Sequence, residues 1–328
     1  MTSLSRIEVT KAQIIEDLKR IGLRNGDHVA VTLSFKSIGH VNGGPDAFID
    51  ALLETVGSDG TIMMNTFTPI YSRDLPSDYV FDHAKTAPYT GLIPRTILKR
   101  KDVFRSMHPT FSVASIGKMA RYLTVSHDET ANPFLPYEKL AKIGGKYLSI
   151  GIGDRLVAIR HEAQRRAGLY IVPNYFCVKF RNSEGESKIF IGLVPPCVKK
   201  LPELVPKLES MGIIKRGKIG MARSIIGSAK KLIDSMTTLL KENPTLNLCD
   251  DLFCYKCREL ERRMNLYGRI INPKLFQINP LIRIVLSWRN NLLLRRLNSC
   301  NSRKTPKWIA KILRITVNIR RVVFNESA

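Results

Sequence analysis

Lys146-Tyr-Leu-Ser-Ile-Gly-Ile-Gly-Asp154 is the stretch of sequence on which the fold prediction rests. A short apolar run that ends in Gly-x-Gly predicts a buried strand that opens into a loop. A helix-like segment follows, with His161-Glu-Ala-Gln164 near its start. Strand, loop and helix in this order predict an α/β protein, whose chemistry is expected in the loops at the strand ends.

The same order of elements stands near the N-terminus. Residues 7–24 predict a helix, Asp27–Thr32 predicts a strand, and a glycine-rich loop from Ser34 to Gly44 leads into a helix over 46–56. Pro45 suits the first helical turn, because its missing N–H would be unpaired there anyway. Free N–H groups and the helix dipole would make this loop an anion cradle. A plain tight turn remains the alternative, because the spacing is neither that of a Walker loop nor that of a dinucleotide fingerprint.

The remaining segments complete an α/β pattern. Residues 61–66 and 111–117 predict strands, and the long turn-rich segment 69–91 suggests a binding or lid loop. The region after residue 200 looks helical, with helices over 201–211 and 222–240 and a small hairpin over 213–220. A polar cluster at Arg105-Ser-Met-His108-Pro109-Thr-Phe-Ser112 precedes the second strand and is a second candidate for site residues.

The charge of the chain is high and unevenly distributed. The sequence has 328 residues and a formal net charge of +24. Residues 251–328 hold 17 of the 52 basic residues but only 4 of the 28 acidic ones. Such a balance predicts anionic partners: a phosphorylated cofactor, a nucleotide-linked substrate, an acidic membrane face or nucleic acid. No zinc finger, RRM or helix-turn-helix signature is present, so we do not expect nucleic-acid binding.

The composition changes after Asp250. Residues 280–297 and 308–324 each place apolar residues, including a tryptophan, on one helical face, and the second segment has basic residues on its other face. Basic amphipathic helices with tryptophan suit an anionic membrane surface. A packed helical subdomain or an oligomer contact is the alternative, and residues 315–319 also fit a strand. We therefore expect a domain over 1–250 and a basic helical extension over 251–328.

The sequence favours a cytoplasmic protein. No signal peptide precedes the first helix, and no run of about 20 apolar residues is present. Peripheral binding at the inner face of the membrane through the basic extension is an added possibility. The six cysteines are few for this length, which fits reduced thiols. Cys249-x4-Cys254-x2-Cys257 suggests metal ligands, but no fourth ligand stands nearby and no histidine follows His161. We therefore expect no metal.

Seven motifs in a fixed order resemble the aminoglycoside 3-N-acetyltransferase family over roughly residues 8–245. They are Ser34…Ser37-Ile-Gly39…Gly43-Gly44 with Ala-Phe-Ile-Asp-Ala-Leu; Gly60-Thr-Ile-Met-Met…Thr66; Phe81-Asp82…Gly91; Arg105-Ser…His108-Pro…Ser112…Gly117; Pro133-Phe…Lys139-Leu; Gly145-Lys…Gly151-Ile-Gly153; and His161-x-Ala163. The resemblance implies an α/β fold with a mixed central sheet flanked by helices. It also implies acetyl transfer from acetyl-CoA to an amino group of an aminosugar, by direct attack.

The resemblance also suggests roles for individual residues. His161 would be the general base, and the loop containing Ser34, Ser37, Gly39, Gly43 and Gly44 would hold the coenzyme together with Thr66. Arg105 and His108 would line the substrate pocket, although His108-Pro109 also fits a simple turn. The family usually has a glutamate three residues after this histidine, where this chain has Gln164. Asp154 or Glu162 would then be candidates to support the imidazole.

The chemistry of amide formation fits these expectations. The attacking amine must lose a proton, for which a neutral imidazole is suitable. The acetyl group must lie within reach of the amine, and backbone N–H groups must stabilise the oxyanion. Because aminoglycosides are polycations and this chain is basic, an alternative acceptor is a nucleotide-linked aminosugar of surface-polysaccharide synthesis. A second alternative, motivated by Gln164, is a catalytically impaired basic protein at a membrane surface.

Overall fold

A seven-stranded mixed sheet forms the centre of the computed structural model, which describes residues 8–69, 79–169, 175–182, 184–193, 196–197, 199, 203–249, 251, 253–258 and 260–261. The strand order is β11-β12-β8-β2-β4-β7-β6. β2 is parallel to β4 and to β8, and the other neighbours are antiparallel. The strands span His28–Leu33 (β2), Thr61–Asn65 (β4), Phe104–Arg105 (β6), Val113–Gly117 (β7), Lys146–Ile150 (β8), Ile214–Ile219 (β11) and Ala222–Ser228 (β12). The predicted mixed sheet is confirmed.

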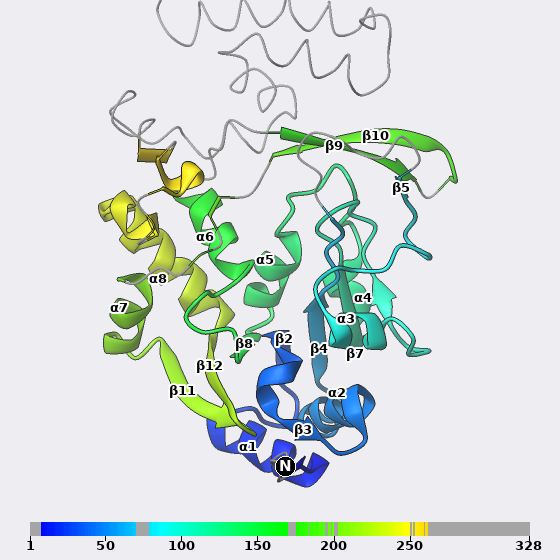
Figure 1. Ribbon diagram of the computed structural model, residues 1–328, viewed down its shortest axis with the longest axis vertical. Coiled ribbons are helices and arrows are strands. Elements are labelled where there is room, and N and C mark those ends of the chain that lie inside the picture. The colour runs from blue at the N-terminus through cyan, green and yellow to red at the C-terminus, as the bar shows by residue number, and fades with distance from the viewer. Residues whose placement is uncertain are drawn as a thin grey trace, which may run out of the picture.

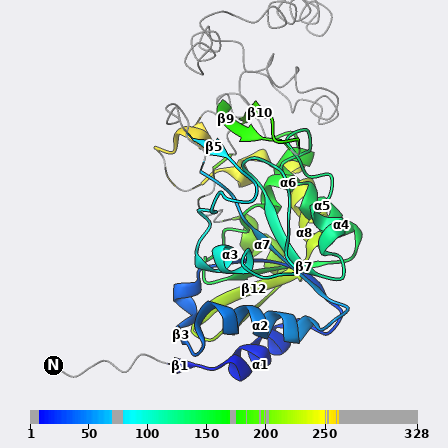
Figure 2. The ribbon, with the colours of Figure 1, turned by 90° about the vertical axis from the view of Figure 1, so that its right-hand side faces the viewer.

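Helices cover both faces of this sheet. Successive side chains of a strand point to opposite faces, and in β2 Val29 and Val31 belong to one apolar cluster while Ala30 belongs to the other. The first cluster contains side chains of α1 (Lys11–Ile21), α2 (Gly44–Val56) and α3 (Leu92–Ile97). The second contains side chains of α5 (Leu135–Lys142), α6 (Ile159–Arg166), α7 (Leu204–Ser210) and α8 (Ala229–Glu242). Figure 2 shows α1 and α2 below β12 and α5, α6 and α8 above it.

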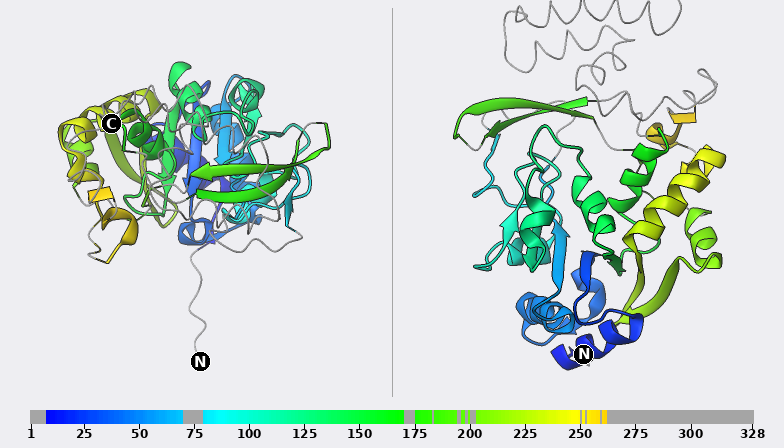
Figure 3. Two further views of the ribbon diagram at one scale, coloured as in Figure 1. Left: turned by 90° about the horizontal axis from the view of Figure 1, so that it is seen from above. Right: turned by 180° about the vertical axis from the view of Figure 1, so that it is seen from behind.

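Two smaller sheets, one short α-helix and two 3₁₀ helices complete the described elements. β1 (Glu8–Val9) pairs with β3 (His40–Val41), and β9 (Tyr175–Arg181) lies between β10 (Ser187–Leu193) and β5 (Val80–Phe81). The β9–β10 hairpin lies across the end of the molecule opposite α1 (Figures 1 and 3), and the sequence analysis did not predict it. The remaining elements are α4 (Ala120–Thr124) and two 3₁₀ helices, η1 (Phe35–Ile38) and η2 (Pro244–Asn247).

Most predicted elements are present, and the largest error lies near the C-terminal end of the described region. The helix predicted over 7–24 is α1, and Thr10 and Gln13 form a capping box at its start. The helix predicted over 222–240 begins only at Ala229, because residues 222–228 form β12. Ile225 faces one apolar cluster and Ile226 the other, since β12 is an inner strand covered on both sides. Two apolar residues therefore follow each other directly, and the sequence lacks the alternation of apolar and polar residues by which a half-buried strand is recognised. The hairpin predicted over 213–220 is instead the pairing of β11 with β12.

The basic extension lies mostly outside the described residues. The helices predicted over 280–297 and 308–324, the alternative strand over 315–319, and Cys300 all fall there. Within the described ranges, none of the helices combines the length and the apolar character needed to span a bilayer.

Candidate active site

The loops after three parallel strands meet at one edge of the central sheet. β2 leads into Ser34, β4 into Thr66 and β8 into Gly151, and parallel strands place their carboxyl ends at the same edge. The Ser34 N–H donates to the carbonyl of Ile150 at 2.9 Å. A Cβ on Gly151 would lie 1.8 Å from the Ser37 hydroxyl oxygen, so the loops after β2 and β8 are in close contact. The loops that were expected to follow these strands therefore lie at one edge of the sheet.

A cleft of about 900 Å³ opens beside the loop between β2 and α2. Predicted residues Ser34, Gly39 and Gly44 line it, together with residues that precede and begin α3. The full lining is Leu33, Ser34, Phe35, Lys36, Gly39, His40, Val41, Gly44, Thr90, Gly91, Leu92, Ile93 and Pro94. The cleft joins segments about 50 residues apart in the sequence and has the size of a small-molecule site.

The start of α2 makes one wall of the cleft suited to an anion. Gly43 is the N-cap residue with a φ of 79°, which favours glycine, and Pro45 stands in the first turn as predicted. The first N–H groups of a helix have no partner within the helix and carry the positive end of its dipole. Lys36 and His40 also line the cleft and are exposed. The sequence analysis did not name these two residues, although basic side chains within a predicted anion loop were a usable signal.

Two predicted coenzyme residues have other contacts. The Ser37 hydroxyl donates to the Ser34 carbonyl at 2.6 Å, which shapes the loop without placing Ser37 in the cleft lining. Thr66 is fully buried, and its hydroxyl lies 2.9 Å from the hydroxyl of Ser112. The hydroxyls of Ser37 and Thr66 therefore hold the loops after β2 and β4 in place. Direct contact of these two residues with the coenzyme stays a prediction.

His161 lies in the first turn of α6, as the sequence analysis predicted, and is 3% exposed. Its Nδ1 lies 2.5 Å from Oε1 of Gln164. The Gln164 amide nitrogen in turn donates to Oδ1 of Asn247, at the end of η2. This second bond orients the amide so that the Gln164 oxygen accepts a hydrogen bond from Nδ1–H, and the lone pair of the imidazole is on Nε2. Asn247 was not named from the sequence, because it lies 83 residues away from Gln164 along the chain.

The environment of His161 keeps the imidazole neutral. The pKa of His161 is lowered to about 3, mainly by burial and also by the nearby charge of Arg160, and the hydrogen bond with Gln164 opposes this shift only in part. A glutamate at position 164 would add a negative charge beside the ring, which an amide does not supply. The imidazole of His161 is therefore neutral at neutral pH, and its Nδ1 contacts an amide rather than a carboxylate.

Neither of the two carboxylates considered as a substitute for that glutamate supports His161. The carboxylate of Glu162 is fully buried and accepts from Arg165 at 2.8 Å and from Arg166 at 2.7 Å. Asp154 pairs with Arg216 at 2.8 Å near the surface. These contacts correct the prediction: of the three candidates, Gln164 is the one with a hydrogen bond to the imidazole.

His108 has the contacts of a turn residue. It is fully buried, and its Nδ1 accepts from the backbone N–H groups of Thr110 at 3.2 Å and Phe111 at 3.1 Å. A row of packed rings connects His108 to His161. The ring centroids are between 5.3 and 5.6 Å apart along His108, Phe111, Phe134 and His161. The two predicted clusters are therefore joined in one core, and the turn-forming alternative accounts for the Nδ1 contacts of His108.

Arg105 is bound to the backbone of residues 83–86, which precede the part of the chain that lines the cleft. One of its terminal nitrogens donates to the carbonyls of His83 at 2.9 Å and Thr86 at 2.7 Å, and its guanidinium lies over the ring of Phe81. Burial lowers the pKa of Arg105 to about 10, so it remains charged at neutral pH. These contacts engage the guanidinium with backbone carbonyls, and a direct contact of Arg105 with the substrate stays a prediction.

The chain is similar to aminoglycoside acetyltransferases in sequence and in fold. Aminoglycoside N(3)-acetyltransferase VII of Streptomyces paromomycinus is 26% identical over 265 residues, which are 71% of this chain and 92% of that enzyme. Aminoglycoside N(3)-acetyltransferase IX of Micromonospora chalcea is 28% identical over 251 residues, 67% of this chain and 89% of that enzyme. The solved structure of AAC-IIIb with CoASH has a TM-score of 0.62 at 24% identity, and the match covers 72% of this chain and 97% of that one.

The model of one protein family, described as aminoglycoside 3-N-acetyltransferase, matches residues 30–241. That range contains the loop that lines the cleft, the strands that position it, and the helix that holds His161 and Gln164. The match covers well over half of the chain and agrees with the motif order read from the sequence. This chain belongs to the aminoglycoside 3-N-acetyltransferase family.

Proposed function

We propose that this protein is an acetyl-CoA-dependent N-acetyltransferase that acetylates an amino group of an aminoglycoside. The observation that carries the proposal is the family match over residues 30–241, because it includes both the cleft loop and the His161 segment. One relative of the same fold has been solved with CoASH, and another, AAC(3)-IVa, with a gentamicin at a TM-score of 0.68 and 22% identity, over 79% of this chain and 99% of that one. Acetylation removes a positive charge from the drug, which fits a role in antibiotic resistance.

The cleft between the β2–α2 loop and the start of α3 is the proposed coenzyme site. Lys36, His40 and the N-terminus of α2 present positive charge to phosphate oxygens. Gly39 and Gly44 allow the pantetheine arm to approach the backbone closely. Backbone N–H groups of this loop would donate to the oxygen of the thioester as negative charge develops on it.

His161 is the proposed general base. The acceptor nitrogen attacks the thioester carbonyl carbon, and Nε2 of His161 takes the proton that this nitrogen loses. The tetrahedral intermediate then collapses, the C–S bond breaks, and the proton passes from His161 to the leaving thiolate of coenzyme A. Gln164 keeps the imidazole in the tautomer that this step needs, because its oxygen accepts from Nδ1.

An aminoglycoside is favoured over the other acceptors considered. The relatives in both comparisons are named for aminoglycoside acetylation. A nucleotide-linked aminosugar was inferred from the basic composition of the chain. However, more than half of the positive net charge lies in residues 251–328, and the family match ends at residue 241. Residues 1–250 still hold 35 basic against 24 acidic residues, so the preference for an aminoglycoside rests on the relatives and not on charge.

The test of this function is release of free thiol from acetyl-CoA in the presence of a panel of aminoglycosides and nucleotide-linked aminosugars. We expect release with at least one aminoglycoside, loss of about 10²–10⁴-fold in His161→Ala, and little change in the exposed variant Lys101→Ala. Release only with nucleotide-linked aminosugars would overturn the proposed acceptor. Coenzyme binding without release for any acceptor would support the catalytically impaired alternative.

We also propose that the extension over 251–328 binds anionic membrane surfaces, which would place the enzyme peripherally at the inner face of the membrane. The support is its excess of basic residues and the amphipathic pattern over 308–324. In cosedimentation with vesicles, the full chain should bind those that contain phosphatidylserine and not those of phosphatidylcholine alone. A variant with Lys307, Lys311, Arg314 and Arg321 changed to glutamine should bind less. Equal binding of variant and wild type would contradict this proposal.

A further inference from the structure

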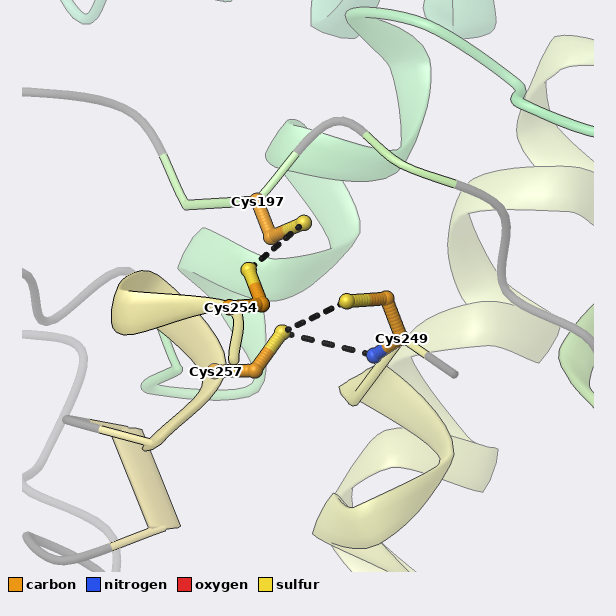
Figure 4. A group of neighbouring side chains, drawn as sticks. All are labelled: Cys197, Cys249, Cys254 and Cys257. Atoms are coloured by element: carbon orange, nitrogen blue, oxygen red, sulfur yellow. Dashed lines mark hydrogen bonds between the residues drawn. The ribbon is translucent and has the colours of Figure 1, made fainter. Parts of the chain in front are cut away.

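Four cysteines from distant parts of the chain meet at one point, outside the catalytic site. Cys197 follows β10, Cys249 follows η2, Cys254 directly precedes the helical residues 255–258, and Cys257 lies among them (Figure 4). All four are buried, and their sulfur atoms lie within 4.8 Å of one another. Cys197 and Cys254 are 3.6 Å apart at sulfur, and Cys249 and Cys257 are 3.5 Å apart.

We propose that Cys197, Cys249, Cys254 and Cys257 bind one zinc ion in a structural tetrathiolate site. A tetrahedron with zinc–sulfur bonds of about 2.3 Å has sulfur–sulfur edges of about 3.8 Å. Two of the sulfur–sulfur distances, 3.5 and 3.6 Å, are close to this value, and all of them are within 4.8 Å. A tetrahedral set of four sulfur ligands is typical of zinc, and a closed set of four leaves no open position for catalysis.

The arrangement differs from that of two disulfides. A disulfide holds its sulfurs about 2.05 Å apart, and none of the five cysteines within the described ranges is in a disulfide. Two independent disulfides would not require the four sulfurs to share one centre. Backbone N–H groups also point at the sulfurs: Lys199 donates to Cys197 and Cys249 donates to Cys257, each at 3.3 Å. Such bonds stabilise thiolate ligands around a metal.

A buried positive charge beside the cluster provides a second, independent argument. Arg160 is fully buried and donates to the carbonyls of Cys197 and Lys199. Within the part of the chain that the structure describes, no carboxylate pairs with Arg160. An uncompensated buried cation is strongly unfavourable. Zinc with four thiolates carries a net charge of −2, and this charge would compensate Arg160.

The proposed zinc site is connected at two points to the residues that hold His161 in place. Arg160 precedes His161 in α6, and Asn247, which accepts from Gln164, stands two residues before Cys249. A bound metal would hold the end of η2 and the start of α6 in a fixed relation. We therefore expect the zinc ion to position His161 indirectly, through Arg160 and Asn247.

The sequence analysis expected no metal because the Cys249…Cys257 spacing lacked a fourth ligand. The fold supplies that ligand as Cys197, which lies 52 residues before Cys249. Cys197 belongs to the segment that follows the β9–β10 hairpin, which the sequence analysis also did not predict. The proposal therefore revises the expectation of no metal, and it does not depend on the identity of the acceptor.

The test is the metal content of the full-length protein, expressed with zinc in the medium and purified without chelator. We expect about one zinc ion per chain by mass spectrometry of metals in the wild type and in Cys177→Ser, which changes a buried cysteine of β9 outside the cluster. We expect less than about a tenth of that content in Cys254→Ser. His161→Ala should keep its zinc, which separates the metal site from catalysis.

Replacement of zinc by cobalt in the wild-type protein provides a second measurement if Cys254→Ser does not fold. Tetrahedral thiolate coordination should give intense ligand-to-cobalt absorption and visible bands between cobalt d orbitals. Absence of both zinc and these bands would overturn the proposal. So would disulfides between Cys197 and Cys254 and between Cys249 and Cys257 in the protein as purified. One iron ion per chain in place of zinc would overturn the assignment of the metal.

Discussion

At His161 the hydrogen-bond partner of the imidazole is a neutral amide, and this difference from the family pattern leaves burial as the main influence on the pKa of the ring. Oε1 of Gln164 orients the ring by accepting from Nδ1, which a glutamate would also do. A glutamate would in addition stabilise the imidazolium by its charge. The amide therefore preserves orientation while the pKa of His161 stays near 3.

We predict that Gln164→Glu raises the pKa of His161 and increases acetyl transfer near neutral pH. An opposite charge at hydrogen-bond distance raises such a pKa by about 1–3 units. Asn247 can rotate its amide and donate to the new carboxylate, so the support from η2 is kept. The measurement is the dependence of kcat on pH between 4 and 9, in which the acid limb should move to higher pH. Gln164→Asn, which is shorter and uncharged, should lower kcat; an unmoved acid limb in Gln164→Glu would contradict the prediction.

The position of a single residue in the site was predictable from the sequence where a local motif of strand, loop and helix determines that position. Ser34, Gly39 and Gly44 line the cleft because strand, glycine-rich loop and helix follow one another directly. Residues whose role depends on a distant contact were not predictable. Asn247 and Cys197 have no local signal, and Asp154 was misassigned because Arg216, which binds it, lies far away along the chain. Arg165 and Arg166 stand three and four residues after Glu162, so this pairing could have been predicted from helical spacing.

At the level of elements, the contact between η1 and the loop after β8 holds the coenzyme loop in place. We predict that Gly151→Ala displaces this loop, because its Cβ would overlap the Ser37 hydroxyl at 1.8 Å and its φ of 65° is unfavourable for alanine. The Michaelis constant for acetyl-CoA should rise about tenfold, with a smaller change in kcat, in steady-state assays.

Gly153→Ala provides the matched control for this contact. Gly153 has nearly the same φ, 67°, but a Cβ there would meet no atom within 4 Å. Both variants should lose about 1–2 kcal/mol of unfolding free energy from backbone strain, as measured by urea denaturation. Only Gly151→Ala should raise the Michaelis constant for acetyl-CoA. Equal constants in the two variants would show that the contact with Ser37 is unimportant for coenzyme binding.

Elements were predictable where local pattern and tertiary environment agree. α1 has both a capping box and a regular apolar face, and β8 is an apolar run closed by glycine. β12 was wrongly predicted to be part of a helix. Because both of its faces are buried, apolar residues follow one another in its sequence and do not alternate with polar ones. The β9–β10 hairpin has neither a two-residue glycine turn nor strict alternation, so its pairing becomes apparent only from the three-dimensional arrangement.

At the level of the whole molecule, buried neutral histidines connect stability to pH. Burial lowers the pKa of both His127 and His161 to about 3, whereas the unfolded chain binds these protons near pH 6.5. The unfolded state thus holds more protons between these values. The unfolding free energy should fall as pH decreases below about 6.5, by about 1.4 kcal/mol per pH unit and per histidine.

Urea denaturation between pH 7.5 and 5 measures this dependence. His127→Gln should reduce the slope, because glutamine keeps a donor for the carbonyl of Pro133 but does not titrate. His40→Gln, at an exposed position of the cleft, is the control and should leave the slope of the wild type unchanged. If the unfolding free energy of His127→Gln depended on pH as steeply as that of the wild type, His127 would not be a source of the pH dependence.

The division into residues 1–250 and 251–328 stays a prediction, and the packing suggests where to test it. Leu260 is buried in a cluster with Leu240 and Leu246. A chain that ends at Glu261 should therefore keep its thermal stability and acetyl transfer. A chain that ends at Asp250 loses Leu260, Cys254 and Cys257, and its melting temperature should be lower by several degrees, since burial of one leucine alone contributes about 2 kcal/mol. Equal melting temperatures would support a boundary at residue 250.

The position of β12 in the sheet has a consequence for synthesis on the ribosome. β8 ends at Ile150, but the strand that covers one of its edges begins only at Ala222. While the intervening residues are being made, that edge of β8 exposes unpaired backbone groups, and such edges pair readily with other chains. Nascent chains that stop before Ala222 should therefore be prone to aggregation, and a chaperone that shields β8 during this interval should raise the yield of folded enzyme.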